Sequence, residues 1–175
     1  MRILALGLGN DLYGDDGVGF HAVRLLRNAW TAGAQPAGTL DEVDFVECPV
    51  SGVALLDVIH GYDALMIIDT IIKDDPVTGR IRLLETADVR DVPGPSPHYV
   101  SIPQTLAIGK LLGLKMPVTV KIIAVEAKNL FRLGEGLSEE MKARLPEILD
   151  AASHVLRGLV RRPPSDTIVS VKPAG

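Results

Sequence analysis

One apolar run limits the folds open to this chain more than any other feature: Ala64-Leu65-Met66-Ile67-Ile68. It stops at Asp69, and its length and composition predict a central strand that is buried on both faces. Ile3 to Leu6 forms a second run of this kind and leads into the turn Gly7-Leu8-Gly9-Asn10. Strands buried on both faces belong to parallel sheets that helices cover on each side.

Helical and strand-like segments alternate through the rest of the chain. A stripe at helical spacing predicts a helix from Asp16 onward, and it consists of Val18, Ala22, Leu25, Leu26 and Ala29. The other expected elements are an outer strand over Val43 to Val46, a short helix over Val53 to Ile59, an edge strand over Arg80 to Leu84, a helix over Pro103 to Leu112, a strand over Val118 to Val125, and a long helix with Ser138 as N-cap and Pro146 as a kink or restart. This order predicts a three-layer α/β/α sandwich with a twisted, mainly parallel five-stranded sheet, in which one edge strand can be antiparallel.

Composition narrows the class of protein. The chain has 175 residues, of which 47% are hydrophobic and 23% charged, so we expect one α/β domain over residues 1–162 and a mobile tail over 163–175. The net charge of −4 argues against nucleic acid as a partner. Cys48 is the single cysteine, and no secretory signal or membrane-length apolar run is evident, so we expect a cytoplasmic protein that is a monomer or a weak homo-oligomer.

Three polar residues follow predicted strands or precede predicted helices, where α/β sheets bind ligands. Asp16 opens the first helix, Asp69 ends the central strand, and His98 stands in a Pro-rich loop before a helix. Two carboxylates and one imidazole could hold a divalent metal with open positions. Simpler interpretations stay open, because the pair Asp15-Asp16 can serve as a helix start and Asp69 as a turn former.

Other chemistries find less support. A dinucleotide fingerprint needs a third glycine where Leu12 stands. The chain has no Gly-x-Ser-x-Gly elbow, and Cys48-Pro49 has no evident base nearby, which disfavours a serine or cysteine nucleophile. Water is therefore the expected nucleophile.

Several motifs together resemble the hydrogenase maturation proteases, over a stretch from Met1 to about Leu159. They are Gly7-Leu8-Gly9-Asn10, Asp15-Asp16-Gly17 with Gly19, the apolar strand ending at Asp69, Ser96-Pro97-His98, and Gly134-Glu135-Gly136-Leu137-Ser138. The resemblance implies an endopeptidase that removes a short C-terminal extension from the large-subunit precursor of a nickel-iron hydrogenase after nickel has been inserted.

The resemblance also implies roles for individual residues. Asp16, where relatives often carry Glu, Asp69 and His98 would bind nickel and carry the catalysis. The nickel would come with the precursor, and another divalent metal could substitute for it. Gly9, Asn10 and Glu47 would help to position the substrate, although Glu47-Cys48-Pro49-Val50 stands where relatives commonly carry an Asp-Gly-Gly-Thr-like turn.

Alternatives from other classes stay open at this point. The same residues could serve an aspartic-type or a metal-assisted peptidase, or a metal-dependent hydrolase of a small substrate, such as a phosphoesterase. A nucleotide-binding module would use the glycine turn, a protease of spore proteins shares the fold, and a purely structural protein would keep Asp16, Asp69 and His98 apart.

Overall fold

The computed structural model describes residues 1–88, 101–128, 130, 133–134 and 136–160. The strands are β1 (Arg2–Leu8), β2 (Glu42–Cys48), β3 (Ala64–Ile71), β4 (Ile81–Glu85) and β5 (Thr119–Glu126). The α-helices are α1 (Val18–Ala29), α2 (Leu56–Ile59), α3 (Ile102–Leu111) and α4 (Glu139–Leu159). Shorter helical turns lie at Gly14–Gly17, Trp30–Ala34, Gly52–Leu55 and Thr86–Asp88.

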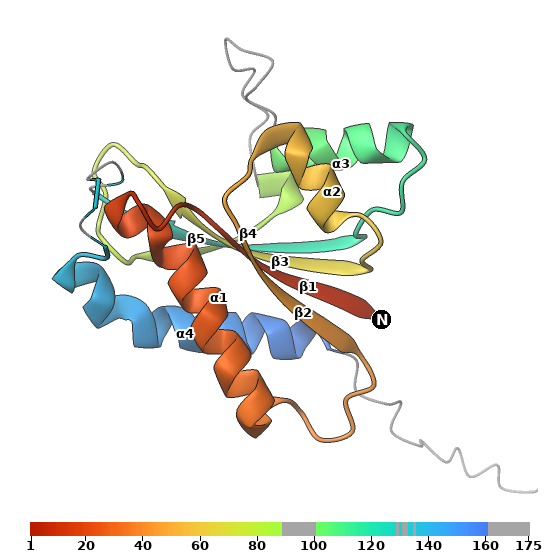
Figure 1. Cartoon of the computed structure of the whole chain (residues 1–175), viewed down its shortest axis with the longest axis horizontal. Coiled ribbons are helices and arrows are strands. Elements are labelled where there is room, and N and C mark those ends of the chain that lie inside the picture. The colour runs from red at the N-terminus through yellow and green to blue at the C-terminus, as the bar shows by residue number, and fades with distance from the viewer. Residues whose placement is uncertain (89–100, 129, 131–132, 135, 161–175) are drawn as a thin grey trace, which may run out of the picture.

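The strands form one five-stranded sheet in the order β2-β1-β3-β5-β4. All neighbouring pairs are parallel except β4 and β5, which are antiparallel. Helices α1 and α4 cover one face of this sheet, and α2 and α3 cover the other (Figure 1). The predicted three-layer sandwich, its mainly parallel sheet and the antiparallel edge strand are confirmed.

Strand β1 shows why the middle of a central strand is apolar at successive positions. Ile3 and Ala5 face the core beneath α1 and α4, whereas Leu4 and Leu6 face the core beneath α2 and α3. Successive strand residues point to opposite faces, and here both faces are covered, so no position of this kind can be left polar. Burial of each of the isoleucine and leucine side chains stabilises the fold by roughly 1.5–3 kcal/mol.

Two glycines let α1 cross the ends of β1 and β3 at close range. A Cβ on Gly7 would lie 2.2 Å from the carbonyl oxygen of Gly19. A Cβ on Gly19 would lie 2.2 Å from the carbonyl oxygen of Leu8 and 2.6 Å from that of Ile68. Only glycine permits this approach, which places the first turn of α1 directly over the carboxyl end of the sheet.

Strand β3 is longer than its apolar run predicts. Pairing with β1 ends at Ile68, but pairing with β5 continues through Asp69, Thr70 and Ile71. The sequence predicts Asp69 at the C-terminal tip of the strand, and this prediction is wrong. Asp69 is instead the first residue of β3 that is no longer paired with β1. Asp69, Thr70 and Ile71 are also only partly buried, unlike the five residues of the apolar run before them.

Two details of the helices also differ from the predictions. The chain makes a 3₁₀ turn at Gly14–Gly17 before α1 begins at Val18, and Leu25 is exposed on α1, while Val23 lies in the core. Pro146 neither breaks nor restarts α4, which is one helix from Glu139 to Leu159 with the predicted N-cap. Because Pro146 lies beyond the first turn and has no N–H, the helix continues through it with one backbone hydrogen bond fewer.

Glu126 anchors the connection between β3 and β4. Its carboxylate is buried at the end of β5, where it accepts hydrogen bonds from the N–H of Val77 at 3.0 Å and from Nε of Arg82 at 2.7 Å. These bonds, together with the charges of Arg82 and Arg80, hold the pKa of Glu126 below its ordinary value. The antiparallel edge strand is thus fixed by a buried carboxylate as well as by its ladder.

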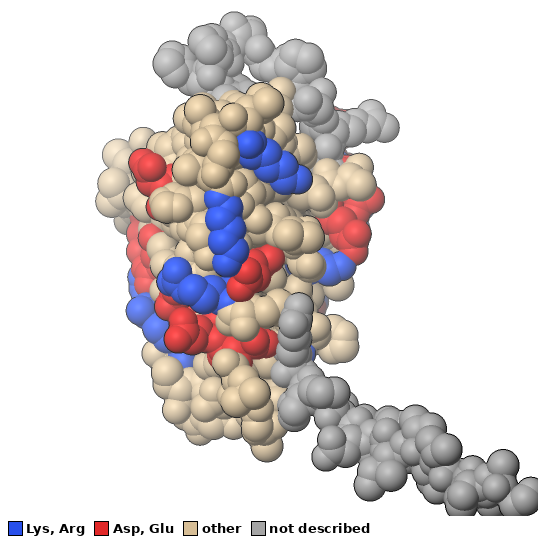
Figure 2. Space-filling model, turned by 90° about the vertical axis from the view of Figure 1, so that its right-hand side faces the viewer, with Lys and Arg blue, Asp and Glu red and all other residues tan. Residues whose placement is uncertain are grey.

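The surface at the amino ends of the parallel strands carries charges of both signs side by side (Figure 2). Arg2 pairs there with Asp44 at 3.0 Å, and Lys115 pairs with Asp63 at 2.7 Å.

Within the described ranges, no helix has the length and apolar character needed to cross a bilayer.

Candidate active site

Thr70 of β3 connects the two aspartates that the sequence singles out. Its hydroxyl donates a hydrogen bond of 2.8 Å to Oδ1 of Asp16, and its backbone N–H donates one of 2.8 Å to Oδ1 of Asp69. The structure therefore brings together carboxylates that are far apart in sequence, at the carboxyl end of the sheet where ligands of α/β proteins bind.

Asp16 is placed by the 3₁₀ turn that precedes α1. Its N–H donates to the carbonyl oxygen of Tyr13 at 3.0 Å. Gly9, with a φ of 135°, lies against the same turn, and a Cβ there would be 1.9 Å from the carbonyl oxygen of Asp16. Gly9 thus makes room for the backbone of Asp16, whereas the substrate-positioning role predicted for Gly9 stays a prediction.

Asp15, the other member of the acidic pair, has a different task. It is buried, and its carboxylate accepts hydrogen bonds from the N–H of Ser138 at 2.7 Å and from the hydroxyl of Ser138 at 2.9 Å. The hydroxyl of Ser138 in turn accepts the N–H of Met141 at 3.1 Å. The side chain of Asp15 therefore stabilises the start of α4, whereas the capping interpretation predicts that it stabilises the start of its own helix. Of the two acidic residues, only Asp16 lies in the candidate site.

The surroundings of Asp69 raise its pKa to about 6. Loss of hydration is the main cause, the nearby charge of Asp16 adds to it, and the hydrogen bond from the N–H of Thr70 opposes it. A carboxyl group with a pKa near 6 can hold or release a proton close to neutral pH, which general acid and base catalysis requires.

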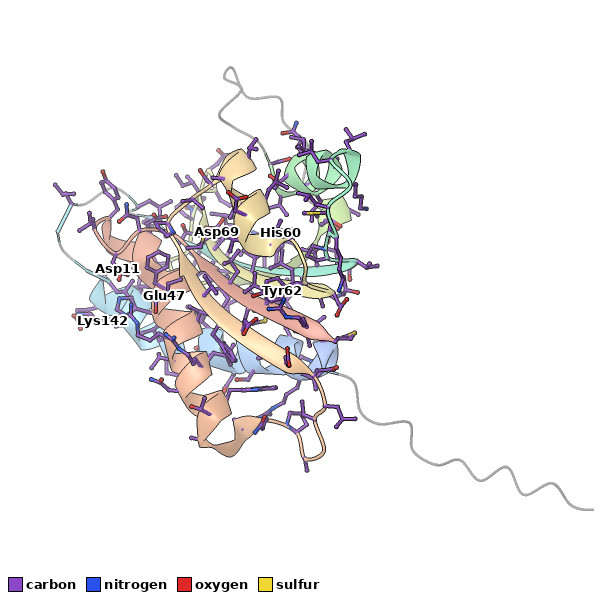
Figure 3. All side chains as sticks on the ribbon, turned by 45° about the vertical axis from the view of Figure 1, so that its right-hand side comes forward. Asp11, Glu47, His60, Tyr62, Asp69 and Lys142 are labelled. Atoms are coloured by element: carbon purple, nitrogen blue, oxygen red, sulfur yellow. The ribbon has the colours of Figure 1, made fainter. Side chains whose placement is uncertain are left out.

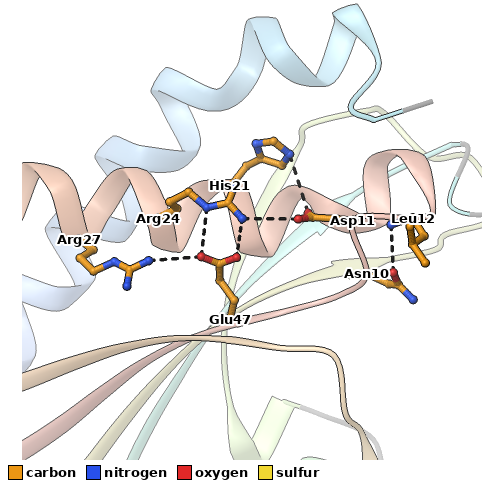
Figure 4. A network of polar contacts seen from close by, with 7 residues as sticks. All are labelled: Asn10, Asp11, Leu12, His21, Arg24, Arg27 and Glu47. Atoms are coloured by element: carbon orange, nitrogen blue, oxygen red, sulfur yellow. Dashed lines mark hydrogen bonds and ion pairs between the residues drawn. The ribbon is translucent and has the colours of Figure 1, made fainter. Parts of the chain in front are cut away.

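Glu47 belongs to a network of ion pairs beside the site (Figure 4). It accepts from Nε of Arg24 at 3.1 Å and from Arg27 at 3.3 Å. The pairing with Arg24 lowers the pKa of Glu47 and raises that of Arg24. Asp11 joins the network at 3.5 Å from Arg24. The substrate role predicted for Glu47 is untested, and its carboxylate already has partners.

Figure 3 shows Asp11, Glu47 and Asp69 toward one end of the sheet. Asn10 lies in the same region, where its side-chain oxygen accepts the N–H of Leu12 at 3.0 Å in a local turn. The predicted role of Asn10 in positioning the substrate likewise stays a prediction.

The third predicted ligand, His98, lies outside the described residues, as does the rest of its Pro-rich loop. Among the described residues, no group of three or more His, Cys, Asp or Glu side chains is arranged to hold a metal ion. The described residues thus bring two carboxylates together, and the nickel-binding role of Asp16, Asp69 and His98 stays a prediction.

Sequence reasoning missed Thr70 and the partner of Asp15. A threonine directly after a strand-terminal aspartate gave no signal by itself, because its role depends on a turn that is 54 residues away in sequence. Ser138 was predicted as an N-cap, but nothing in the sequence linked it to Asp15, which is 123 residues away.

An α/β sandwich with two adjacent carboxylates at the carboxyl end of its sheet is a scaffold suited to hydrolysis. The model of the hydrogenase maturation protease family matches residues 32–155 of this chain. The chain belongs to that family, and thus to a family of peptidases.

Individual relatives agree with this assignment. The hydrogenase expression/formation protein HupD of Thiocapsa roseopersicina is 27% identical over 173 residues, which cover 96% of this chain and 74% of the relative. The [NiFe] hydrogenase maturation protease HybD of Thermococcus kodakarensis is 26% identical, with a TM-score of 0.57 over 89% of this chain and 99% of that one. The hydrogenase maturating endopeptidase HybD of Escherichia coli shares the fold, with a TM-score of 0.71 and 24% identity over 92% of this chain and 96% of that one.

Proposed function

We propose that this protein is the endopeptidase that removes the C-terminal extension from the large-subunit precursor of a nickel-iron hydrogenase after nickel insertion. The observation that carries the proposal is the Thr70-linked pair of Asp16 and Asp69 in a member of the maturation protease family. A peptidase needs a group that can exchange a proton near neutral pH, and Asp69, with a pKa of about 6, has this property.

In this proposal nickel is part of the substrate. Asp16 and Asp69, with His98, would bind the nickel already seated in the precursor, and this would bring the scissile bond beside them. Carboxylates and an imidazole are suitable ligands for a divalent first-row metal. The protein would thus select precursors that have received their metal.

The chemistry itself can follow two routes. In the aspartic-type route, Asp69 takes a proton from the attacking water and then, as the carboxylic acid, donates that proton to the leaving amine. In the metal-assisted route, the precursor's own metal polarises the scissile carbonyl, and Asp69 serves only as a ligand. Replacement of nickel in the precursor by other divalent metals separates the routes. The identity of the metal affects recognition, and so KM, in both routes, whereas it affects kcat through the polarised carbonyl only in the second.

Purified protein incubated with nickel-loaded and nickel-free precursor, followed by mass spectrometry of the precursor's C-terminus, tests the proposal. We expect the extension to be lost from the nickel-loaded form alone. Normal cleavage of the nickel-free form would remove nickel from recognition. The variant His98→Ala should fail to process the loaded precursor, and unaltered processing by it would exclude His98 from the mechanism.

A further inference from the structure

Two loops beside the site expose apolar side chains where they meet. Leu12 and Tyr13, from the loop between β1 and α1, are 62% and 37% exposed, and Leu133, from the loop between β5 and α4, is 70% exposed. Tyr13 and Leu133 form an antiparallel bridge, and the N–H of Gly134 donates to the carbonyl oxygen of Leu12 at 2.9 Å. We call Leu12, Tyr13 and Leu133 the apolar ledge.

The ledge is joined to the Asp16 turn by hydrogen bonds. The carbonyl oxygen of Tyr13 accepts the N–H of Asp16, and the N–H of Tyr13 donates to the carbonyl oxygen of Asn10, both at 3.0 Å. The paired bonds between Asp15 and Ser138 tie the same two connections together a second time. These hydrogen bonds hold the apolar ledge at a fixed position relative to Asp16, at the rim of the candidate site.

Charged residues border the ledge on one side. Asp11 precedes Leu12 in the chain and interacts with Arg24, which pairs with Glu47 (Figure 4). An apolar centre with a charged, solvent-accessible rim is the usual composition of a protein–protein contact. Large apolar side chains that a loop holds in solvent mark such contacts when they are grouped rather than scattered.

We propose that the apolar ledge binds an apolar patch on the folded body of the large-subunit precursor while the scissile segment lies at Asp16 and Asp69. This inference rests on the proposed function. A segment attached to a folded protein can reach the two carboxylates only if that protein comes against the rim around them, and Leu12 and Tyr13 of the ledge stand four and three residues before Asp16. Contact there would bury the side chains that the free protein leaves in water.

The test compares Leu12→Ser, Leu133→Ser and the double variant with a control, Leu40→Ser plus Leu111→Ser. Leu40 and Leu111 are 85% and 87% exposed; Leu40 lies just before β2, and Leu111 is the last residue of α3, so neither belongs to the two loops that form the ledge. Each variant is assayed for kcat and KM on the folded, nickel-loaded precursor, and its thermal unfolding is compared with that of the wild type. Because all four leucines are exposed, we expect the unfolding midpoints to stay close to that of the wild type.

The ledge predicts that KM rises about 10-fold for each single variant and further for the double variant, with kcat within about twofold of the wild type, because the lost contact is the same in the ground state and the transition state. The control should behave like the wild type. An unchanged KM in the double variant, or a fall in kcat alone, would overturn the inference and leave the proposed function standing. Failure of the wild type to cleave the loaded precursor would overturn both.

Discussion

Thr70 holds Asp16 from across the sheet edge: its hydroxyl donates a hydrogen bond of 2.8 Å to Oδ1 of that carboxylate. The N–H of the same residue donates to Asp69. One residue of β3 thus fixes the relative positions of both carboxylates. Neither aspartate could turn away without losing its own hydrogen bond to Thr70.

Thr70→Val tests this link. Valine keeps the shape of the side chain and the backbone N–H but removes the hydroxyl, so Asp69 keeps its bond while Asp16 loses one. We expect the free energy of unfolding to fall by about 1 kcal/mol and cleavage of the loaded precursor to slow by roughly 10-fold or more. Thr70→Ser restores the hydroxyl and should recover most of the rate. Equal rates in the valine and serine variants would show that the hydroxyl does not position Asp16.

The pKa of Asp69 predicts how stability depends on pH. Its ordinary value is 3.8, and the folded protein raises it to about 6, so the folded state binds a proton that the unfolded state has lost between these values. The wild type therefore loses stability as the pH rises from about 4 to about 6, and the cost persists above that range.

Asp69→Asn removes this titration while it keeps an oxygen that can accept the N–H of Thr70. The free energy of unfolding of the variant minus that of the wild type should increase through the same pH window. At neutral pH we expect this difference to be on the order of 2 kcal/mol, a value that allows for partial access of solvent to Asp69. Urea unfolding of both proteins from pH 4 to pH 8 measures the difference. A difference that does not change with pH would contradict the raised pKa.

Gly9→Ala should displace the Asp16 turn. Its φ of 135° is unfavourable for alanine, and the new Cβ would meet the carbonyl oxygen of Asp16 at 1.9 Å. Gly33→Ala is the matched control, because Gly33 has a φ of 105° and open space around its Cβ position. We expect about 1 kcal/mol of destabilisation for the control and about 3 kcal/mol or more for Gly9→Ala. Similar losses in chemical denaturation would mean that strain alone, not contact with Asp16, sets the cost.

Asp15→Ala should weaken the attachment of α4 to the start of α1. It leaves the N–H and hydroxyl of Ser138 without their buried acceptor, so the free energy of unfolding should fall by about 2–3 kcal/mol. Ser138→Ala removes only the hydroxyl, at about 1 kcal/mol. If Asp15 acts through Ser138, the two losses measured by urea unfolding are not additive in the double variant. Strict additivity would indicate that they act independently.

The sequence predicted those parts of the fold that follow from local pattern. Continuous apolar runs at Ile3 to Leu6 and Ala64 to Ile68 marked buried parallel strands, and Ser138 marked the start of the last helix. The extension of β3 to Ile71 was missed, because Asp69 and Thr70 interrupt the apolar run and the last three residues are held by pairing with β5 alone. Strand ends of this kind depend on the neighbouring strand and not on local composition.

For the candidate site, the rule that ligands bind at the carboxyl ends of parallel strands was sufficient to single out Asp16 and Asp69, which the structure places together. It could not assign Asp15 to α4 or identify Thr70, because both roles arise from contacts between distant segments. The apolar ledge could not be predicted either, because the sequence does not indicate that a single leucine such as Leu12 is exposed.

The central claim is that Asp16 and Asp69 cut the precursor. The most direct measurement is the intact mass of nickel-loaded precursor over time with the wild type, Asp16→Asn and Asp69→Asn, each variant first shown to be folded. We predict a single loss of the C-terminal extension with the wild type, and rates lower by a factor on the order of 1,000 or more with either variant. Cleavage by either variant at the rate of the wild type would contradict the account.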